Sequence, residues 1–208
     1  MRKVAATFDF EKSLWKQNKR YVVGIDEVGR GAWAGPLVAA AVIFPKDFDS
    51  KTGLFDSKLL SVLQREKLNE FVWENSLVVG IGQTEVSEII KLGLTLATQL
   101  AYQRALVKIE SKIDHYFIDA FYLKDLPKEN QTPIVRGDQL CASIAAASIV
   151  AKVYRDRLMQ SLGQFYEKYN LAANKGYGTK AHQEAIANFG LTALHRSNYN
   201  LRFLNVKD

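Results

Sequence analysis

Apolar segments and helical segments alternate along the chain. Residues 37–44 are apolar without interruption, which is typical of a strand buried on both faces. Shorter apolar runs at 21–26, 76–83, 115–119 and 133–135 predict four further strands. Because helical segments separate these strands, the pattern indicates an α/β core.

Helices are predicted between and after the strands. Ser61 is a good N-cap for a helix that runs to about residue 75, with Leu63 among its inward-facing side chains. Gly93 is expected to separate a short helix from a longer one, and Gly190 to end the last helix. The length fits one domain with a modest appendage or two small domains, and the pattern predicts a helical C-terminal part. The remaining helices are expected at 5–17, 94–111, 139–169 and 181–189.

Composition narrows the class of protein. The 208 residues are 48% hydrophobic and 24% charged, as in a globular protein with a sizeable core. The net charge of +6 favours a polyanionic partner, with nucleic acid first. The single cysteine, Cys141, excludes an intrachain disulfide and a cysteine-based metal site, and it fits a reducing cytoplasm. The chain shows neither a signal-peptide pattern nor a bilayer-length apolar run, so we expect a cytoplasmic protein without membrane contact. A monomer is a separate expectation, which these patterns do not decide.

Acidic residues stand where two predicted strands end and where one helix begins. Asp26 and Glu27 follow the first apolar run, Asp119 ends the fourth, and Asp138 comes directly after Gly137. Strand ends meet at one edge of an α/β sheet, and ligands bind there. Carboxylates gathered at such an edge repel one another unless cations lie between them. The acids therefore predict a metal site.

The residue types indicate which metal and which chemistry. Oxygen ligands without cysteine or paired histidines favour Mg²⁺ or Mn²⁺ over Zn²⁺. Two such ions about 3.5–4 Å apart activate a water molecule and stabilise the leaving oxygen of a phosphoryl displacement. Neighbouring strand residues face opposite sides, so we expect Asp26 and Glu27 to share a site only if the strand breaks there, as Gly29 permits. For each acid alone, the alternative is a helix cap or a solvated charge.

The ordered set of motifs resembles one known family, bacterial ribonuclease HII, the type 2 ribonuclease H. The similarity runs from about residue 21 to residue 199, and any single motif would be a weak signal. It is carried by residues 24–31 (Gly-Ile-Asp-Glu-Val-Gly-Arg-Gly), 56–58 (Asp-Ser-Lys), 118–120, 137–138, 143–152, 155–156, 175–179 (Lys-Gly-Tyr-Gly-Thr), His182, His195 and Arg196.

The resemblance implies a ribonuclease H-like mixed sheet flanked by helices, with about residues 155–208 as a helical C-terminal extension of one domain, 1–208. It implies a metal-dependent endoribonuclease that hydrolyses the RNA strand of RNA–DNA hybrids. It also implies cleavage 5′ to single ribonucleotides in duplex DNA, which leaves a 3′-hydroxyl and a 5′-phosphate. With Mg²⁺ or Mn²⁺ as cofactor, the implied catalytic residues and metal ligands are Asp26, Glu27, Asp119 and Asp138.

Substrate contacts are implied as well. Gly29, Arg30 and Gly31 correspond to the turn that senses the ribonucleotide, and Tyr177 to the residue that stacks on the neighbouring deoxyribose. A 2′-hydroxyl both donates and accepts hydrogen bonds, which suits main-chain groups in a glycine turn. The other expected substrate contacts are Ser57, Lys58, Arg136, Ser143 and Ser148, and Lys152, Arg155 and Arg157 could form a basic helix face on duplex phosphates. The alternatives are a capped loop with a surface lysine for Ser57 and Lys58, helix packing for Ser143 and Ser148, and a solvated surface for the basic helix face.

The sequence departs from the family pattern at three positions. Arg136 stands where a lysine is expected, Trp33 where smaller residues are usual, and Asn174 where a histidine is common. These changes bear on substrate preference. Two other functions are possible on the same residues: a catalytically silent nucleic-acid-binding module, and another phosphoryl-transfer enzyme such as an integrase-like nuclease or ribonuclease HIII. The presence of all four acids argues against the first, and the short segment before the first strand argues against ribonuclease HIII.

Overall fold

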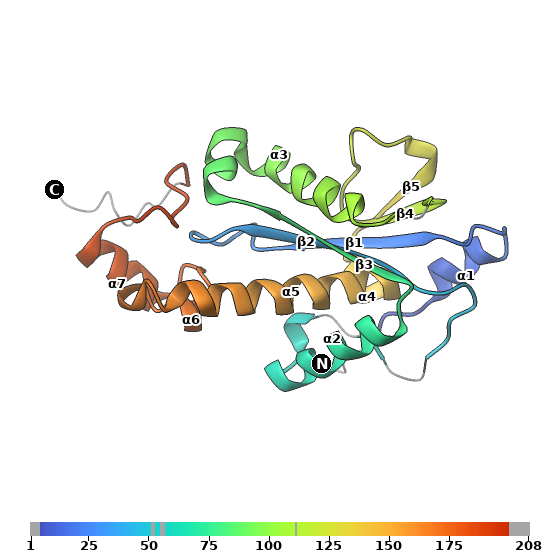
Figure 1. Cartoon of the computed structure of the whole chain (residues 1–208), viewed down its shortest axis with the longest axis horizontal. Coiled ribbons are helices and arrows are strands. Elements are labelled where there is room, and N and C mark those ends of the chain that lie inside the picture. The colour runs from blue at the N-terminus through green and yellow to red at the C-terminus, as the bar shows by residue number, and fades with distance from the viewer. Residues whose placement is uncertain (1–4, 51–52, 55–56, 111, 200–208) are drawn as a thin grey trace.

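A five-stranded mixed sheet lies between two layers of helices (Figure 1). The computed structural model describes residues 5–50, 53–54, 57–110 and 112–199, so Asp56 of the 56–58 motif lies outside the described residues. The strand order is β3-β2-β1-β4-β5, antiparallel from β3 to β1 and parallel from β1 to β5. This confirms the predicted mixed α/β sheet, whose strands are β1 (Val22–Val28), β2 (Leu37–Ile43), β3 (Val78–Thr84), β4 (His115–Asp119) and β5 (Gln131–Ile134).

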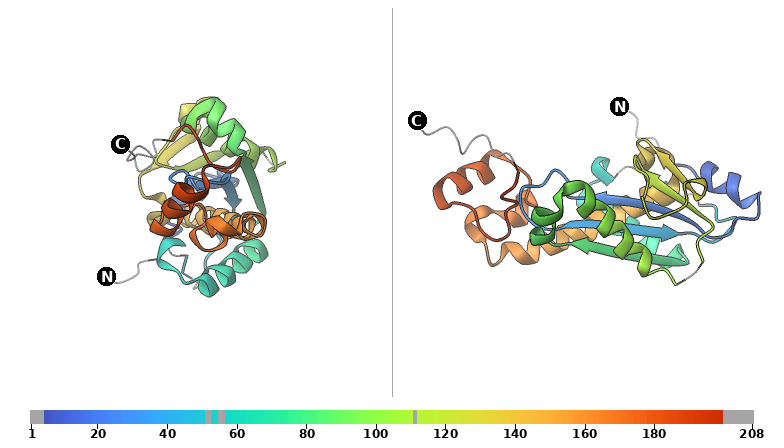
Figure 2. Two further views of the ribbon diagram at one scale, coloured as in Figure 1. Left: turned by 90° about the vertical axis from the view of Figure 1, so that its left-hand side faces the viewer. Right: turned by 90° about the horizontal axis from the view of Figure 1, so that it is seen from above.

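Helices cover both faces of the sheet. The helix α3 (Val86–Val107) packs on one face, and α5 (Ala142–Gly163) packs on the other (Figure 1). The helix α2 (Val62–Asn75) packs against α5 on the side away from the sheet. Beyond one end of the sheet lie α6 (Leu171–Asn174) and α7 (Lys180–Phe189), as Figures 1 and 2 show. The first helix, α1 (Asp9–Trp15), lies at the opposite end.

Small residues allow α5 to lie directly on β1. The N-terminal half of α5 is rich in buried alanine and serine, as expected for a helix close to a sheet. Opposite it stands Gly24 of β1, where a Cβ would overlap the backbone of Ser143 and Ile144. The missing side chain at this point sets the distance between the sheet and the helix.

The prediction of one continuous helix over 139–169 is wrong. The structure has a short helix α4 (Gly137–Leu140), a break, and then α5, which ends at Gly163 and is followed by a 3-10 turn at Glu167–Tyr169. The break is at Cys141, whose backbone is extended (φ −109°, ψ 122°). There the N-terminal segment pairs with the chain, because Thr7 N donates to Leu140 O (3.2 Å) and Ala142 N donates to Thr7 O (2.9 Å).

Other predictions are confirmed, with small corrections. Ser61 caps α2 in a reciprocal capping box, and Gly93 interrupts α3 with a left-handed φ of 76°. Leu63, predicted to face inward, is 66% exposed, so that prediction is wrong. The first helix begins at Asp9 and not at residue 5, because Ala6 forms a bridge with Leu54 instead.

The contact between α5 and β1 can be tested by adding one methyl group. Gly24→Ala is expected to lower the free energy of unfolding by about 1–3 kcal/mol or more, because its Cβ has no room against the α5 backbone. Urea denaturation of the metal-free protein measures this change. Gly31→Ala is the matched control, since a Cβ at Gly31 meets nothing within 4 Å. Equal stability of the two variants would contradict the close-packing account.

Candidate active site

The fold brings the four predicted acids to one region. Asp26 and Glu27 lie near the end of β1, and Asp119 is the last residue of the neighbouring parallel strand β4. These three residues line one cleft. Asp138, in α4, is tied to that cleft by Lys58, whose Nζ lies 2.8 Å from its Oδ2. The sheet edge that the sequence indicated is therefore where the acids meet.

The expected break in the first strand does not occur. β1 continues through Val28, so Asp26 and Glu27 point to opposite faces of the sheet. Asp26 faces α5, where Ser148 hydrogen bonds to its carboxylate, and Glu27 faces α3, where it accepts a hydrogen bond from Tyr102. The two acids line one cleft at the sheet edge although the strand does not break between them.

Asp26 is the most strongly perturbed carboxyl group of the cleft. It is only 5% exposed, and its Oδ1 accepts a hydrogen bond from Glu27 N at 2.7 Å. Burial, followed by the charges of Glu27 and Asp119, raises the pKa of Asp26 well above its ordinary value. The hydrogen bond from Ser148 opposes that shift. A cation beside these carboxylates would favour their ionised forms.

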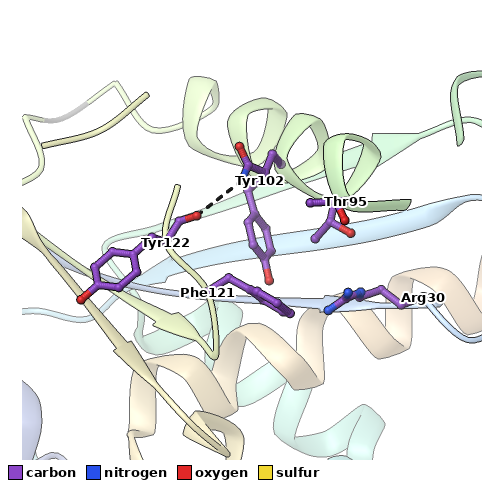
Figure 3. Close-up of a pocket in the computed structure, with 7 residues that line it drawn as sticks. Arg30, Thr95, Tyr102, Phe121 and Tyr122 are labelled. Carbon is purple, nitrogen blue, oxygen red and sulfur yellow. Dashed lines mark hydrogen bonds between the residues drawn. The ribbon is translucent and has the colours of Figure 1, made fainter. Parts of the chain in front are cut away.

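Glu27 is held from two directions. The Tyr102 hydroxyl donates to its Oε2, and an Arg30 guanidinium nitrogen lies 3.5 Å from its Oε1. Burial raises the pKa of Glu27, whereas the Tyr102 hydrogen bond and the Arg30 charge lower it. In Figure 3 the Tyr102 side chain points from α3 toward Phe121 and Arg30. Arg30 Cζ lies 4.5 Å from the centre of the Phe121 ring, a cation–π contact that fixes the guanidinium.

Asp119 and Asp138 are linked through the start of α4. Asp119 Oδ1 accepts a hydrogen bond from Gly137 N at 2.8 Å, so the backbone turn before Asp138 rests on Asp119. Burial, and to a lesser extent the charge of Asp138, raises the pKa of Asp119. Asp138 itself is 4% exposed and pairs with Lys58. The four acids therefore form one electrostatically connected group.

The donor chemistry of this group suits a hard divalent cation. The carboxylates supply oxygen ligands, and burial penalises their ionised forms unless positive charge is near. In the part of the chain that the structure describes, no three Asp, Glu, His or Cys side chains converge on one metal position. Instead, Lys58 and Arg30 supply positive charge to Asp138 and Glu27.

Several predicted substrate residues lie in the same cleft. Gly29 and Tyr177 line it, as do Ser57, Lys58 and Ser148, and Lys152 adds a positive charge. Gly29 has a left-handed φ of 96°, which favours glycine. Gly31 is exposed with open space around it, so of the two glycines only Gly29 has a conformation that a side chain would strain. The hydroxyl groups of Ser57 and Ser148 lie 3.1 Å apart.

Two predicted contact residues lie elsewhere. Ser143 is fully buried, and its hydroxyl donates to Glu11 at 2.6 Å, so its expected contact with nucleic acid is corrected. Arg155 is also fully buried, and its guanidinium donates to the carbonyl oxygens of Pro36, Ala34 and Lys175. It is therefore no part of a basic surface. Arg136 is exposed and adopts a left-handed conformation (φ 58°) just before α4.

The residues around Tyr177 explain two departures from the family pattern. Trp33 packs against Gly178, where a Cβ would overlap its ring, so it buttresses the turn that carries Tyr177. Asn174 Oδ1 accepts from Gly176 N at 2.8 Å, and its Nδ2 donates to Tyr169 O at 2.7 Å. Lys152 Nζ lies 5.8 Å from the centre of the Tyr177 ring. These contacts aim the ring into the cleft.

Both C-terminal histidines support the same turn. His182 Nδ1 lies 3.0 Å from Tyr177 O, and His182 Nε2 lies 3.1 Å from His195 Nε2. Burial lowers the pKa of His182, and burial together with His182 lowers the pKa of His195 to about 4. Both imidazoles are therefore neutral at pH 7, and they support the turn through their hydrogen bonds.

Sequence reasoning missed Tyr102. Its position on a buried helix face is visible in the pattern of α3, but nothing local indicates that its hydroxyl reaches an acid 75 positions earlier. It also missed Glu11, whose carboxylate accepts hydrogen bonds from Ser143 N at 2.8 Å and from Cys141 Sγ. Both contacts depend on tertiary structure alone.

The architecture and the acid cluster define a ribonuclease H-like protein. The ribonuclease HII in the PCNA:RNase HII complex from Archaeoglobus fulgidus matches with a TM-score of 0.71 at 23% identity, over 88% of this chain and 96% of that one. The Bst-RNase HIII solved in complex with Mn²⁺ matches with a TM-score of 0.68 at 18% identity, over 90% of this chain and 70% of that one. These likenesses confirm the fold.

Sequence comparison identifies the family. The Ribonuclease HII family profile matches residues 23–206. A ribonuclease HII of Synechococcus sp. (strain JA-3-3Ab) is 46% identical over 198 residues, which cover 94% of this chain and 89% of the relative. The chain belongs to the ribonuclease HII family and is a ribonuclease H endonuclease. None of the described helices has the length and apolar character needed to cross a membrane.

The raised pKa of Asp26 predicts an unusual dependence of stability on pH. The unfolded chain loses its proton near the ordinary value of 3.8, whereas the folded chain keeps it to higher pH. Folding stability is therefore lost as pH rises from about 4 through the folded pKa, by at most about 1.4 kcal/mol per unit. Asp26→Asn removes this loss, so its stabilising effect should grow with pH and then level off.

The measurement is urea denaturation of the parent and Asp26→Asn proteins in chelator at pH 5, 6, 7 and 8. Using the difference between the two proteins cancels the opposite contributions of His115 and His195, whose lowered pKa values reduce stability toward acid. A difference that stays constant or shrinks with pH would show that Asp26 ionises without a desolvation cost.

Proposed function

We propose that this enzyme hydrolyses the RNA strand of RNA–DNA hybrids and cuts 5′ to single ribonucleotides in duplex DNA, leaving a 3′-hydroxyl and a 5′-phosphate. The observation that carries the proposal is one cleft that combines three acids, one buried and two partly buried, with a glycine turn and an aromatic ring: Asp26, Glu27, Asp119, Gly29 and Tyr177. The acids suit metal-dependent phosphoryl chemistry, and the turn and ring suit recognition of a sugar.

Asp26, Glu27, Asp119 and Asp138 would hold Mg²⁺ or Mn²⁺. Bound ions would supply an activated water molecule and charge stabilisation at the leaving oxygen. The residues themselves set the conditions for such binding. Ser148 orients Asp26, Gly137 N orients Asp119, and Lys58 shields Asp138 from its neighbours. Each acid is thus supported by a group that fixes its oxygens before an ion arrives.

Recognition of the substrate is assigned to the rim of the cleft. Gly29 and Gly31 bracket a turn with Arg30 between them, and the exposed Gly31, with open space around it, would let a 2′-hydroxyl approach the main chain. Ser57, Lys58, Ser148 and the exposed Arg136 would contact phosphates or sugars. Tyr177 would stack on the deoxyribose beside the ribonucleotide. A hybrid or a ribonucleotide-containing duplex is therefore the proposed partner.

The C-terminal helices belong to this site because the turn between α6 and α7 carries Tyr177. We assign residues 1–208 to one domain in which about 155–208 form the helical extension. The extension joins the core through Arg155, Arg196 and a buried apolar cluster that includes Ala34, Met159 and Ile186. A monomer supplies every residue of the proposed site, and a cytoplasmic location places it with its nucleic-acid substrates.

Replacing one acid tests the metal role. Asp119→Asn is expected to bring cleavage of a hybrid below detection, because it removes an anionic ligand with little change of shape. Binding of the hybrid should change by less than about tenfold, or 1.4 kcal/mol. Cleavage assays and binding in the presence of chelator measure the two quantities separately.

Asp125→Asn is the matched control, because Asp125 is an exposed acid outside the four-acid group. It should cleave like the parent. Near-normal turnover by a folded Asp119→Asn protein would refute the assignment of Asp119, and a parallel loss of binding would make it a residue of substrate affinity.

Two substitutions at Tyr177 test how a single ribonucleotide is found. Tyr177→Phe keeps the ring and should retain more cleavage than Tyr177→Ala on duplex DNA with one ribonucleotide. The alanine variant should lose more activity on that substrate than on a long hybrid, since a hybrid offers many registers and tolerates poorer positioning. Rates are compared for both variants on both substrates at equal salt and Mg²⁺.

Equal losses on the two substrates would assign Tyr177 a general structural role. Such a role would act through the ring, whose centre lies 5.4 Å from Cζ of the buried Arg155. Measuring thermal stability of the two variants separates this contribution from junction sensing.

A further inference from the structure

Two adjacent strand residues serve the proposed metal site from opposite faces of the sheet. Because β1 stays regular through Val28, Asp26 turns toward α5 and Glu27 turns toward α3. Both nevertheless line the same cleft. Glu27, on the face covered by α3, therefore needs a contact that holds its side chain at the same edge of the sheet as Asp26.

Tyr102 provides that contact. Its hydroxyl donates a hydrogen bond to Glu27 Oε2, while Glu27 Oε1 is the oxygen that faces Arg30. One oxygen is thus fixed by an uncharged donor, and the other faces the guanidinium of Arg30 at the rim. The Arg30 side chain is about a third exposed, whereas Tyr102 is 1% exposed.

The position of Tyr102 is set by the packing of α3. The helix lies close to β3, because a Cβ at Gly80 or Gly82 would overlap the α3 carbonyl groups of Ala105 and Ala101. The Tyr102 ring belongs to the buried cluster on this face, together with Ile89, Ala97 and Ile118. The hydroxyl therefore has a fixed place, and Figure 3 shows the side chain pointing away from its helix toward Phe121 and Arg30.

We propose that Tyr102 is a positioning residue for Glu27, whose hydrogen bond holds one carboxylate oxygen so that the other is presented to a divalent cation. The proposal rests on the proposed function, in which Glu27 is a metal ligand. Hydrogen-bonded partners of metal ligands commonly contribute about 10- to 100-fold to metal affinity. Tyr102 therefore acts through Glu27 and need not touch the substrate.

Tyr102→Phe tests this directly, because it removes only the hydroxyl. We expect binding of Mn²⁺ to the metal-free enzyme to weaken by about tenfold or more, measured by titration with electron paramagnetic resonance without substrate. The Mg²⁺ concentration for half-maximal cleavage should rise by a similar factor, while cleavage at saturating Mg²⁺ recovers most of the parent rate.

Tyr169→Phe is the matched control. Tyr169 is also buried and donates through its hydroxyl, but its acceptors are the carbonyl oxygens of Phe189 and Gly190, away from the acids. It should alter stability without moving the Mn²⁺ affinity. A purely structural role of Tyr102 would give the same result as this control.

A double-mutant cycle with Glu27→Gln separates the two proposals. Glu27→Gln alone should weaken Mn²⁺ binding, and adding Tyr102→Phe should then have little further effect, because both act through one carboxylate. If Glu27→Gln weakens binding and Tyr102→Phe leaves it unchanged or tightens it, the positioning role is overturned and the ligand role stands. If Glu27→Gln binds Mn²⁺ like the parent, the ligand role fails and the positioning role fails with it.

Discussion

The structure depends on burying two adjacent carboxylates in the middle strand of the sheet. β1 lies between β2 and β4, and its two faces are covered by α5 and α3. A buried carboxylate without donors is costly, and each face must therefore supply its own. Ser148 on α5 and Tyr102 on α3 meet that requirement. The registers of both helices against the sheet are thereby tied to the site.

Two buried arginines extend this constraint to the C-terminal helices. Arg155 donates to Ala34 O and Pro36 O, and Arg196 donates to Gly35 O and Arg30 O. These carbonyls belong to the turn that follows β1. Burial lowers the pKa of Arg155 to about 10, so its guanidinium stays charged at pH 7 and its hydrogen bonds are charge-assisted. The turn that would read the sugar is thus held by the same segment that presents Tyr177.

The sequence pattern correctly predicted the elements that are determined by residues close together in the chain. The apolar run of β2 and the acid-terminated run of β4 identified those strands, and Ser61 identified the start of α2. The acids were found because strand ends are visible in sequence. What failed was decided by contacts between distant residues: Thr7 breaks the helix at Cys141, and Glu11 takes the hydroxyl of Ser143. Arg155 looked like a surface charge because its carbonyl partners lie more than a hundred residues away.

The electrostatics of the cleft link the folded state to its proposed ions. Burial raises the pKa of Asp26, Glu27 and Asp119 together, so ionising all three in the metal-free protein is unfavourable. Lys58 and Arg30 offset part of this cost at the rim, but neither pairs with Asp26. A divalent cation at the proposed site would supply the missing charge at the most buried acid. Its binding would then be coupled to the release of protons, as is general for ligands that must be deprotonated. The burial that disfavours ionised carboxylates in the metal-free cleft would therefore also favour a cation bound between them.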